Sequence, residues 1–158
     1  MKTTALVGIC AVFAVSVIPL SSPAKADTDA CALLTAAQVG AAAGFPVSEG
    51  KHVTPTFVKT CTWTGTGGGG VQTVTLNLQT GAFFDGAKKQ ASMMAAAGAT
   101  VKPAGVGDDS YYLVEGTQVA LWVKKGGNAF KVAIYEKIPV DKKEGIELAL
   151  AKGVVPKL

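Results

Sequence analysis

The chain has 158 residues and a formal net charge of +4, and hydrophobic residues make up 49% of it. All 15 basic residues are lysine, so the chain lacks arginine, the side chain that reads phosphate and guanine with two hydrogen bonds. The small net charge and the missing arginine argue against nucleic-acid binding and favour a globular domain with its own core.

The first 26 residues have the pattern of a cleavable signal peptide. A lysine follows the first methionine, residues 6–20 are apolar but too short for a comfortable membrane span, and Ala24-Lys25-Ala26 is a small-x-small cleavage site. An uncleaved signal anchor is the alternative, and the prolines that interrupt the apolar run disfavour it. We therefore expect residues 27–158 to be a single mature domain without a membrane span, placed in the periplasm or secreted.

Removal of the signal peptide discards Cys10 and leaves two cysteines, Cys31 and Cys61. An even number of cysteines in an exported chain favours a disulfide between them, and two free thiols are the alternative. The bridge would close a loop of about 30 residues, which the chain-entropy model values at roughly 3 to 4 kcal/mol. In residues 60–64 the alternation of a strand places Cys61 and Trp63 together on the core face.

The predicted elements follow the order helix, two strands, helix, three or four strands, helix. Thr35 and Gln38 fit a capping box before a helix that ends at Gly44. Strands are expected at residues 60–64, 71–79, 99–102, 110–115, 118–124 and 129–135, and longer helices at residues 83–97 and 141–153. Short antiparallel connections indicate an α+β domain, with a sheet of about five antiparallel strands, helices packed on one face and one disulfide.

The last strands also predict a binding surface. If Leu121 and Val132 face the core, their neighbours in sequence share the opposite face of the sheet. The predicted binding residues on this face are Trp122, Lys124, Lys131 and Tyr135, and Tyr112 is expected to join them. Exposed aromatic rings between lysines would suit a partner protein or a small acidic or carbohydrate ligand. The alternative is that another segment, such as residues 45–59, covers this face and makes it core.

Four short motifs connect the chain to known proteins. They are Cys31-Ala32-Leu33-Leu34-Thr35, Cys61-Thr62-Trp63, Gly105-Val106-Gly107-Asp108-Asp109-Ser110-Tyr111 and the final Val155-Pro156-Lys157-Leu158. Together they resemble a family of small exported bacterial proteins of unknown function that is common among actinobacterial lipoproteins. The resemblance implies a fold similar to PsbP-like domains, a bridge between Cys31 and Cys61, and no established activity. The chain lacks the lipidated cysteine that this family usually carries at the cleavage site.

Catalytic and metal-binding patterns are weak. His52 is the only histidine, so a zinc site of the usual kind is not expected once both cysteines are bridged. Asp108 and Asp109 could bind calcium weakly, but a role in a turn fits them better. We expect a monomeric, non-catalytic binding or interaction module without cofactor or metal. The alternative is a small hydrolase-like enzyme, which would need His52 or the aspartate pair in a pocket beside a nucleophile.

Overall fold

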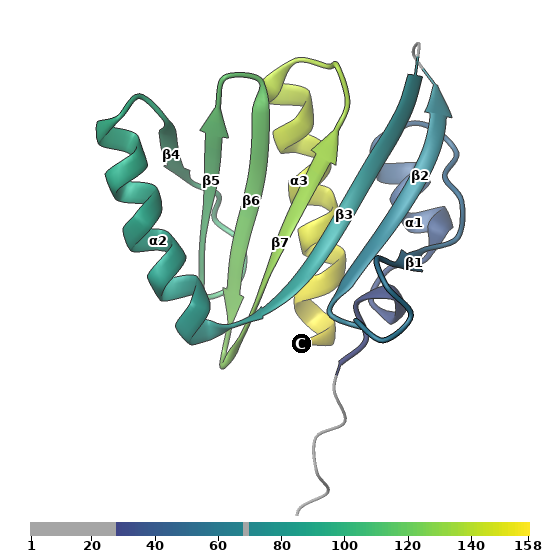
Figure 1. Ribbon diagram of the computed structural model, residues 1–158, viewed down its shortest axis with the longest axis horizontal. Helices are drawn as coiled ribbons and strands as arrows, with labels where there is room; N and C mark the ends of the chain where they lie inside the picture. The colour runs from purple at the N-terminus through teal and green to yellow at the C-terminus, as the bar shows by residue number, and fades with distance from the viewer. Residues whose placement is uncertain (1–27, 68–69) are drawn as a thin grey trace, which may run out of the picture.

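The computed structural model describes residues 28–67 and 70–158, so the predicted signal peptide lies outside the described residues. Its centre is one antiparallel sheet with the strand order β1-β2-β3-β7-β6-β5-β4 (Figure 1). The strands are β1 (Lys51–His52), β2 (Thr60–Gly67), β3 (Gly70–Thr80), β4 (Thr100–Pro103), β5 (Asp109–Glu115), β6 (Gln118–Lys125) and β7 (Asn128–Tyr135). The helices are α1 (Ala36–Ala43), α2 (Gly81–Ala96) and α3 (Val140–Val154), with 3₁₀ turns η1 (Ala30–Ala32) and η2 (Val155–Lys157).

The α+β class and the antiparallel sheet are confirmed, but the expected strand number of about five was wrong, because the sheet has seven strands. Of the two edge strands, β4 lies at the short strand expected at residues 99–102, and β1 lies outside the expected ranges. β1 has only two residues and pairs Lys51 with Thr62 and His52 with Cys61. A strand this short shows no alternation in the sequence, so only its partner strand reveals it. β4 is a second short edge strand, paired with β5.

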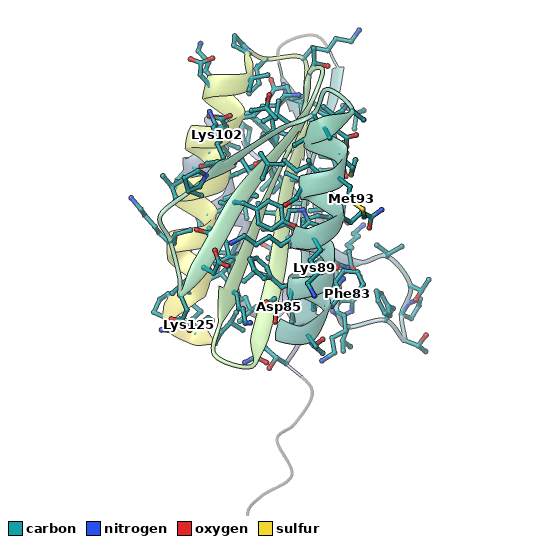
Figure 2. All side chains as sticks on the ribbon, turned by 90° about the vertical axis from the view of Figure 1, so that its left-hand side faces the viewer. Phe83, Asp85, Lys89, Met93, Lys102 and Lys125 are labelled. Atoms are coloured by element: carbon teal, nitrogen blue, oxygen red, sulfur yellow. A yellow bond between two sulfur atoms is a disulfide. The ribbon has the colours of Figure 1, made fainter. Side chains whose placement is uncertain are left out.

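The expectation that all helices pack on one face of the sheet was also wrong. In Figure 2, α2 and α3 lie on opposite sides of the sheet. Thr80 ends β3 and also caps α2, since its side chain accepts a hydrogen bond from the Phe83 N–H. α2 buries Phe84 and Ala91 against Tyr111. The physical reason is that β5 and β6 carry apolar side chains on both faces, and each face needs a cover.

The main core lies between the sheet and the helices α1 and α3. Its largest fully buried side chains include Trp63, Leu76, Phe130 and Leu150. The predicted disulfide is confirmed: Cys31 on η1 is bonded to Cys61 on β2. The predicted capping box at the start of α1 is present as well. Within the described part of the chain, no helix combines the length and the apolar character needed to cross a membrane.

Candidate functional site

The second face of the sheet is only partly covered. α2 packs beside β5 and β6, whereas β2 and β3 carry no helix on that side (Figure 1). We call the uncovered part the open sheet face. It consists of Thr62, Thr64, Thr73, Thr75, Asn77, Gln79, Lys131 and Tyr135, which are half-buried or exposed. Seven of these eight side chains end in an uncharged hydroxyl or amide, so the surface is polar but nearly free of charge.

The strand register aligns these side chains in rows. Thr64 pairs with Thr73 across β2 and β3, and Thr73 pairs with Tyr135 across β3 and β7. Directly paired residues of antiparallel strands place their side chains next to each other on the same face. The two amides are held as well, because Gln79 Nε2 donates to Asn77 Oδ1 and Asn77 Nδ2 donates to the hydroxyl of Thr60. The face is therefore a fixed arrangement of hydrogen-bonding groups.

An aromatic border separates the open sheet face from α2. The ring of Trp122 stacks on Tyr111 at 6.2 Å between centroids and on Phe83 of α2 at 6.1 Å. Lys131 Nζ lies 5.5 Å from the centroid of the Trp122 ring, within the range of a cation–π contact. A cavity of about 560 Å³ between α2 and the sheet is lined by Phe83, Met94 and Trp122, among others. The border thus combines apolar rings with one positive charge.

Three of the predicted binding residues lie at this surface. Tyr135 has 47% of its surface exposed, and Trp122 and Lys131 are half-buried at the border. Lys124 lies on the same side of the sheet but outside the open sheet face, and its Nζ is 2.8 Å from both carboxylate oxygens of Asp85 at the start of α2. Phe45 of the segment 45–59, the cover that the sequence suggested, packs against the main core. On the second face, α2 provides a partial cover.

The prediction for Tyr112 was wrong. Tyr112 is only 5% exposed and belongs to the main core on the other face. Its register explains the error: Tyr112 pairs with Leu121, whereas Tyr111 pairs with Trp122. The Tyr112 hydroxyl donates to the backbone oxygen of Glu144 at 2.8 Å, and burial raises the pKa of this hydroxyl to about 12. Tyr112 is therefore a structural residue that ties α3 to the sheet.

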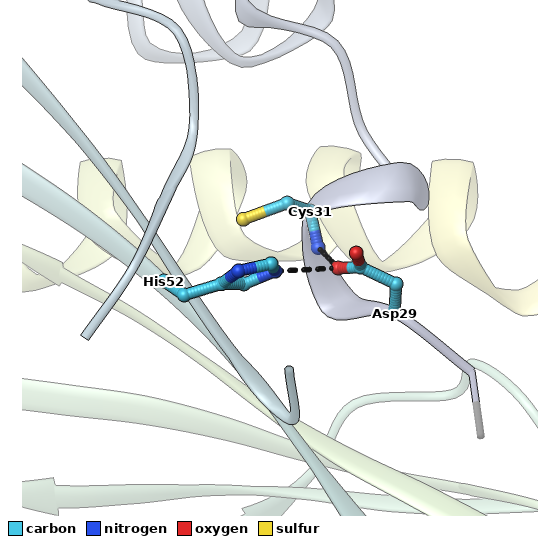
Figure 3. Close-up of side chains that lie close together, drawn as sticks. All are labelled: Asp29, Cys31 and His52. Carbon is cyan, nitrogen blue, oxygen red and sulfur yellow. Dashed lines mark hydrogen bonds and ion pairs between the residues drawn. The ribbon is translucent and has the colours of Figure 1, made fainter. Parts of the chain in front are cut away.

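His52 is paired with a residue that the sequence did not single out. Its Nε2 lies 2.8 Å from Asp29 Oδ1, and the same oxygen accepts the Cys31 backbone N–H at 2.7 Å (Figure 3). The hydrogen bond from His52 is the main cause that holds the pKa of Asp29 below its ordinary value, and the Cys31 N–H adds to it. The two residues are 23 positions apart, so no local signal in the sequence joins them.

The geometry around His52 gives no direct support to a hydrolase. Within residues 28–67 and 70–158, no hydroxyl nucleophile is hydrogen-bonded to the ring, which hydrolysis by a triad would need. Donor atoms of Asp29, Cys31 and His52 lie within 4.8 Å of one another. The Cys31 sulfur belongs to the disulfide, however, and a metal ligand requires the thiolate. In the oxidised protein this cluster therefore offers a metal only two ordinary ligands.

The two adjacent aspartates point to different partners. Asp108 accepts hydrogen bonds from Lys125 Nζ at 2.8 Å and from the Gly126 N–H at 2.7 Å. These contacts, the backbone N–H first, hold its pKa below the ordinary value. Asp109 is bound by Lys88 at 2.6 Å. Each carboxylate has its own lysine, so the geometry fits the turn role better than a shared calcium ion.

The open sheet face contains residues that the sequence analysis did not select. The threonines of β2 and the polar side chains of β3 belong to it because β3 pairs with β7, a strand about 55 positions later in the chain. Their alternation with apolar residues was the available signal. No protein-family model, curated protein or solved structure matches the chain. Its function is therefore inferred from these surfaces alone.

Proposed function

We propose that the protein is a non-catalytic binding module that works outside the cytoplasm and holds its ligand on the open sheet face. The observation that carries the proposal is the exposed ring of Tyr135 at the end of a row of threonines. A polar sheet face with an exposed aromatic ring is typical of a contact surface, because the ring supplies apolar area and its hydroxyl still bonds to water or ligand.

The chemistry of the face favours a carbohydrate that carries an acidic group. Threonine hydroxyls and the amides of Asn77 and Gln79 both donate and accept hydrogen bonds, as the hydroxyls of a sugar do. The Tyr135 ring offers a flat apolar patch for the carbon–hydrogen side of a sugar ring. Lys131 is the cation of the face, and its charge complements a carboxylate or sulfate group. A partner protein is the other ligand class that the sequence allowed.

Rigidity supports the same conclusion. The face is built on the central strands of the sheet, with β3 paired on both sides. Residues on such strands lose little conformational freedom when a ligand binds, which reduces the entropic cost of association. The hydrolase alternative lacks a comparable arrangement of groups in the part of the chain that the structure describes.

The test is binding of residues 27–158 to oligosaccharides of neutral hexoses and of uronic acids, measured by calorimetry. We expect a uronic-acid oligosaccharide to bind, and Tyr135→Ala to weaken binding about tenfold, equal to ~1.4 kcal/mol. Lys131→Gln should weaken binding of the uronic-acid oligosaccharide and leave binding of a neutral oligosaccharide unchanged. Met93→Ala is the matched control, because Met93 is 68% exposed on the outer side of α2 (Figure 2).

Two results would count against this function. Equal weakening by Tyr135→Ala and by Met93→Ala would show that the open sheet face is not the site. No binding to any oligosaccharide, combined with capture of one envelope protein that Tyr135→Ala abolishes, would keep the face and replace the carbohydrate with a protein partner.

A further inference from the structure

The disulfide lies at an edge of the sheet where three segments of the chain meet. η1 contributes Cys31, β2 contributes Cys61, and the edge strand β1 contributes His52. His52 is the direct cross-strand partner of Cys61. It is also the only histidine of the chain. The one imidazole of the protein thus lies next to its one bridge.

The two cysteines differ in their exposure to solvent. Cys61 is 0% exposed, whereas Cys31 is half-buried. Gly50 closes the inner side, since a Cβ at this position would lie 2.6 Å from Cys61 Sγ and 2.7 Å from Trp63 Nε1. A nucleophile from solvent therefore reaches the sulfur of Cys31 first.

The imidazole lies within reach of this sulfur. A ring nitrogen of His52, Cys31 Sγ and a carboxylate oxygen of Asp29 are all within 4.8 Å of one another. Figure 3 shows the Cys31 sulfur next to the His52 ring. Asp29 holds the ring by its hydrogen bond and places a carboxylate beside it. The side chain of His52 is 23% exposed, so solvent reaches the ring.

We propose that the Cys31–Cys61 bridge is a thiol–disulfide exchange site, with Cys31 as the attacked sulfur, His52 as the proton donor and a protein dithiol as the reaction partner. This role is independent of the ligand of the open sheet face. Exchange proceeds by attack of a thiolate on one sulfur and departure of the other, and it is faster when the leaving thiolate is stabilised. His52 meets that need as the direct cross-strand neighbour of Cys61, the residue that leaves, with its ring near the Cys31 sulfur to which Cys61 is bonded.

The thiolate of the dithiol attacks Cys31 Sγ and forms a mixed disulfide, while the bond to Cys61 breaks. Cys61 leaves with the electron pair and takes the proton of the His52 ring. The second thiol of the partner gives its proton to His52, attacks the partner's own sulfur in the mixed disulfide and releases Cys31 as a thiolate. The dithiol is oxidised by two electrons, and the bridge is reduced to one thiol and one thiolate.

The first experiment measures the rate at which dithiothreitol reduces the bridge in the folded protein, residues 27–158, at neutral pH. We expect His52→Gln to lower the rate constant about tenfold, although glutamine keeps a hydrogen-bond donor for Asp29. The equilibrium constant for reduction should fall about tenfold as well, which corresponds to ~30 mV for two electrons. Asp108→Asn, which removes an ion pair far along the chain, is the control and should change neither value.

The second experiment separates the two sulfurs by alkylation of folded single-cysteine variants with iodoacetamide. Cys31 in the Cys61→Ser variant should react at least tenfold faster than Cys61 in the Cys31→Ser variant. Addition of His52→Gln should lower the reactivity of Cys31, because the imidazole lies near its sulfur, whereas the part of the advantage that comes from exposure should remain. Reduction of the His52→Gln protein at the wild-type rate would overturn the proposal, as would equal reactivity of the two thiols. If the single-cysteine variants do not fold, the reduction kinetics of the bridged protein decide alone.

Discussion

The replacement Glu147→Gln tests how the main core tolerates a charge. Glu147 lies on α3, is 0% exposed and accepts the Ile134 N–H at 3.2 Å through Oε1, while its Oε2 has no hydrogen-bond partner among the described residues. Burial raises the pKa of this carboxyl from 4.5 to about 8, although the Ile134 N–H and the charge of Lys143 act in the opposite direction. The protonated form is therefore the one that the fold accommodates at neutral pH.

The sign of the effect on stability follows from proton binding. Below pH 4.5 the carboxyl is protonated in both the folded and the unfolded chain, so the group adds no pH dependence. Between 4.5 and about 8 only the unfolded chain loses the proton, and the free energy of unfolding falls as the pH rises. Above about 8 the loss is complete. A pKa difference of one between the folded and the unfolded chain corresponds to about 1.36 kcal/mol. The upper bound on the loss in the free energy of unfolding is therefore roughly 4 to 5 kcal/mol.

Glutamine keeps the shape and the acceptor for the Ile134 N–H but does not ionise. We expect Glu147→Gln to match the wild type within about 1 kcal/mol at pH 4.5 and to exceed it by a few kcal/mol at pH 8.5. Urea unfolding of residues 27–158, followed by tryptophan fluorescence across this pH range, measures the difference. Asp141→Asn is the control, since Asp141 is an exposed acid on the same helix. A constant difference between pH 4.5 and 8.5 would refute the buried-charge explanation.

Three further substitutions test local features of the fold. Replacement of both Cys31 and Cys61 by alanine should lower the free energy of unfolding by roughly 3 to 4 kcal/mol, and reductant should then have no effect on the variant; an unchanged stability would contradict this. Thr35→Ala should cost about 1 kcal/mol by removing the cap of α1, and Thr35→Ser should restore most of it in the same assay. Gly65→Ala should lower the melting temperature, because its Cβ would lie 2.5 Å from a backbone oxygen, at a cost of about 1 to 3 kcal/mol. Gly86→Ala is its control, since the new Cβ meets open space on α2, and it should stabilise the helix by about 1 kcal/mol.

The features that the sequence predicted correctly depend on neighbours in the chain. The capping box of Thr35 and Gln38 and the meander strands at residues 118–124 and 129–135 were found within one residue or so, as β6 and β7 show. These signals act over three to ten residues. The bridge was predictable for a different reason, because only two cysteines follow the predicted cleavage site. In each case the signal lies in a few neighbouring residues or in the number of cysteines.

The errors concern contacts between distant parts of the chain. A shift of one residue exchanges the two faces of a strand, so the adjacent Tyr111 and Tyr112 could not both lie beside Trp122, and the register selected Tyr111. The pairing of Asp29 with His52 has the same character, since β1 reveals itself only through its pairing with β2. Function is harder to predict than fold here, because the open sheet face and the surroundings of the disulfide are both assembled by such distant contacts.

The position of the open sheet face has a simple origin in the two ends of the sheet. On β3, the side chains that point away from the main core are polar and half-buried, as with Thr73, Thr75 and Asn77. On β5 and β6 the corresponding side chains include Tyr111 and Trp122, which lose contact with water when α2 packs on them. α2 therefore covers the apolar end of this face, because burial of apolar surface drives the packing. The polar end stays open for the same reason, and a ligand that binds there has to form hydrogen bonds as good as those of water.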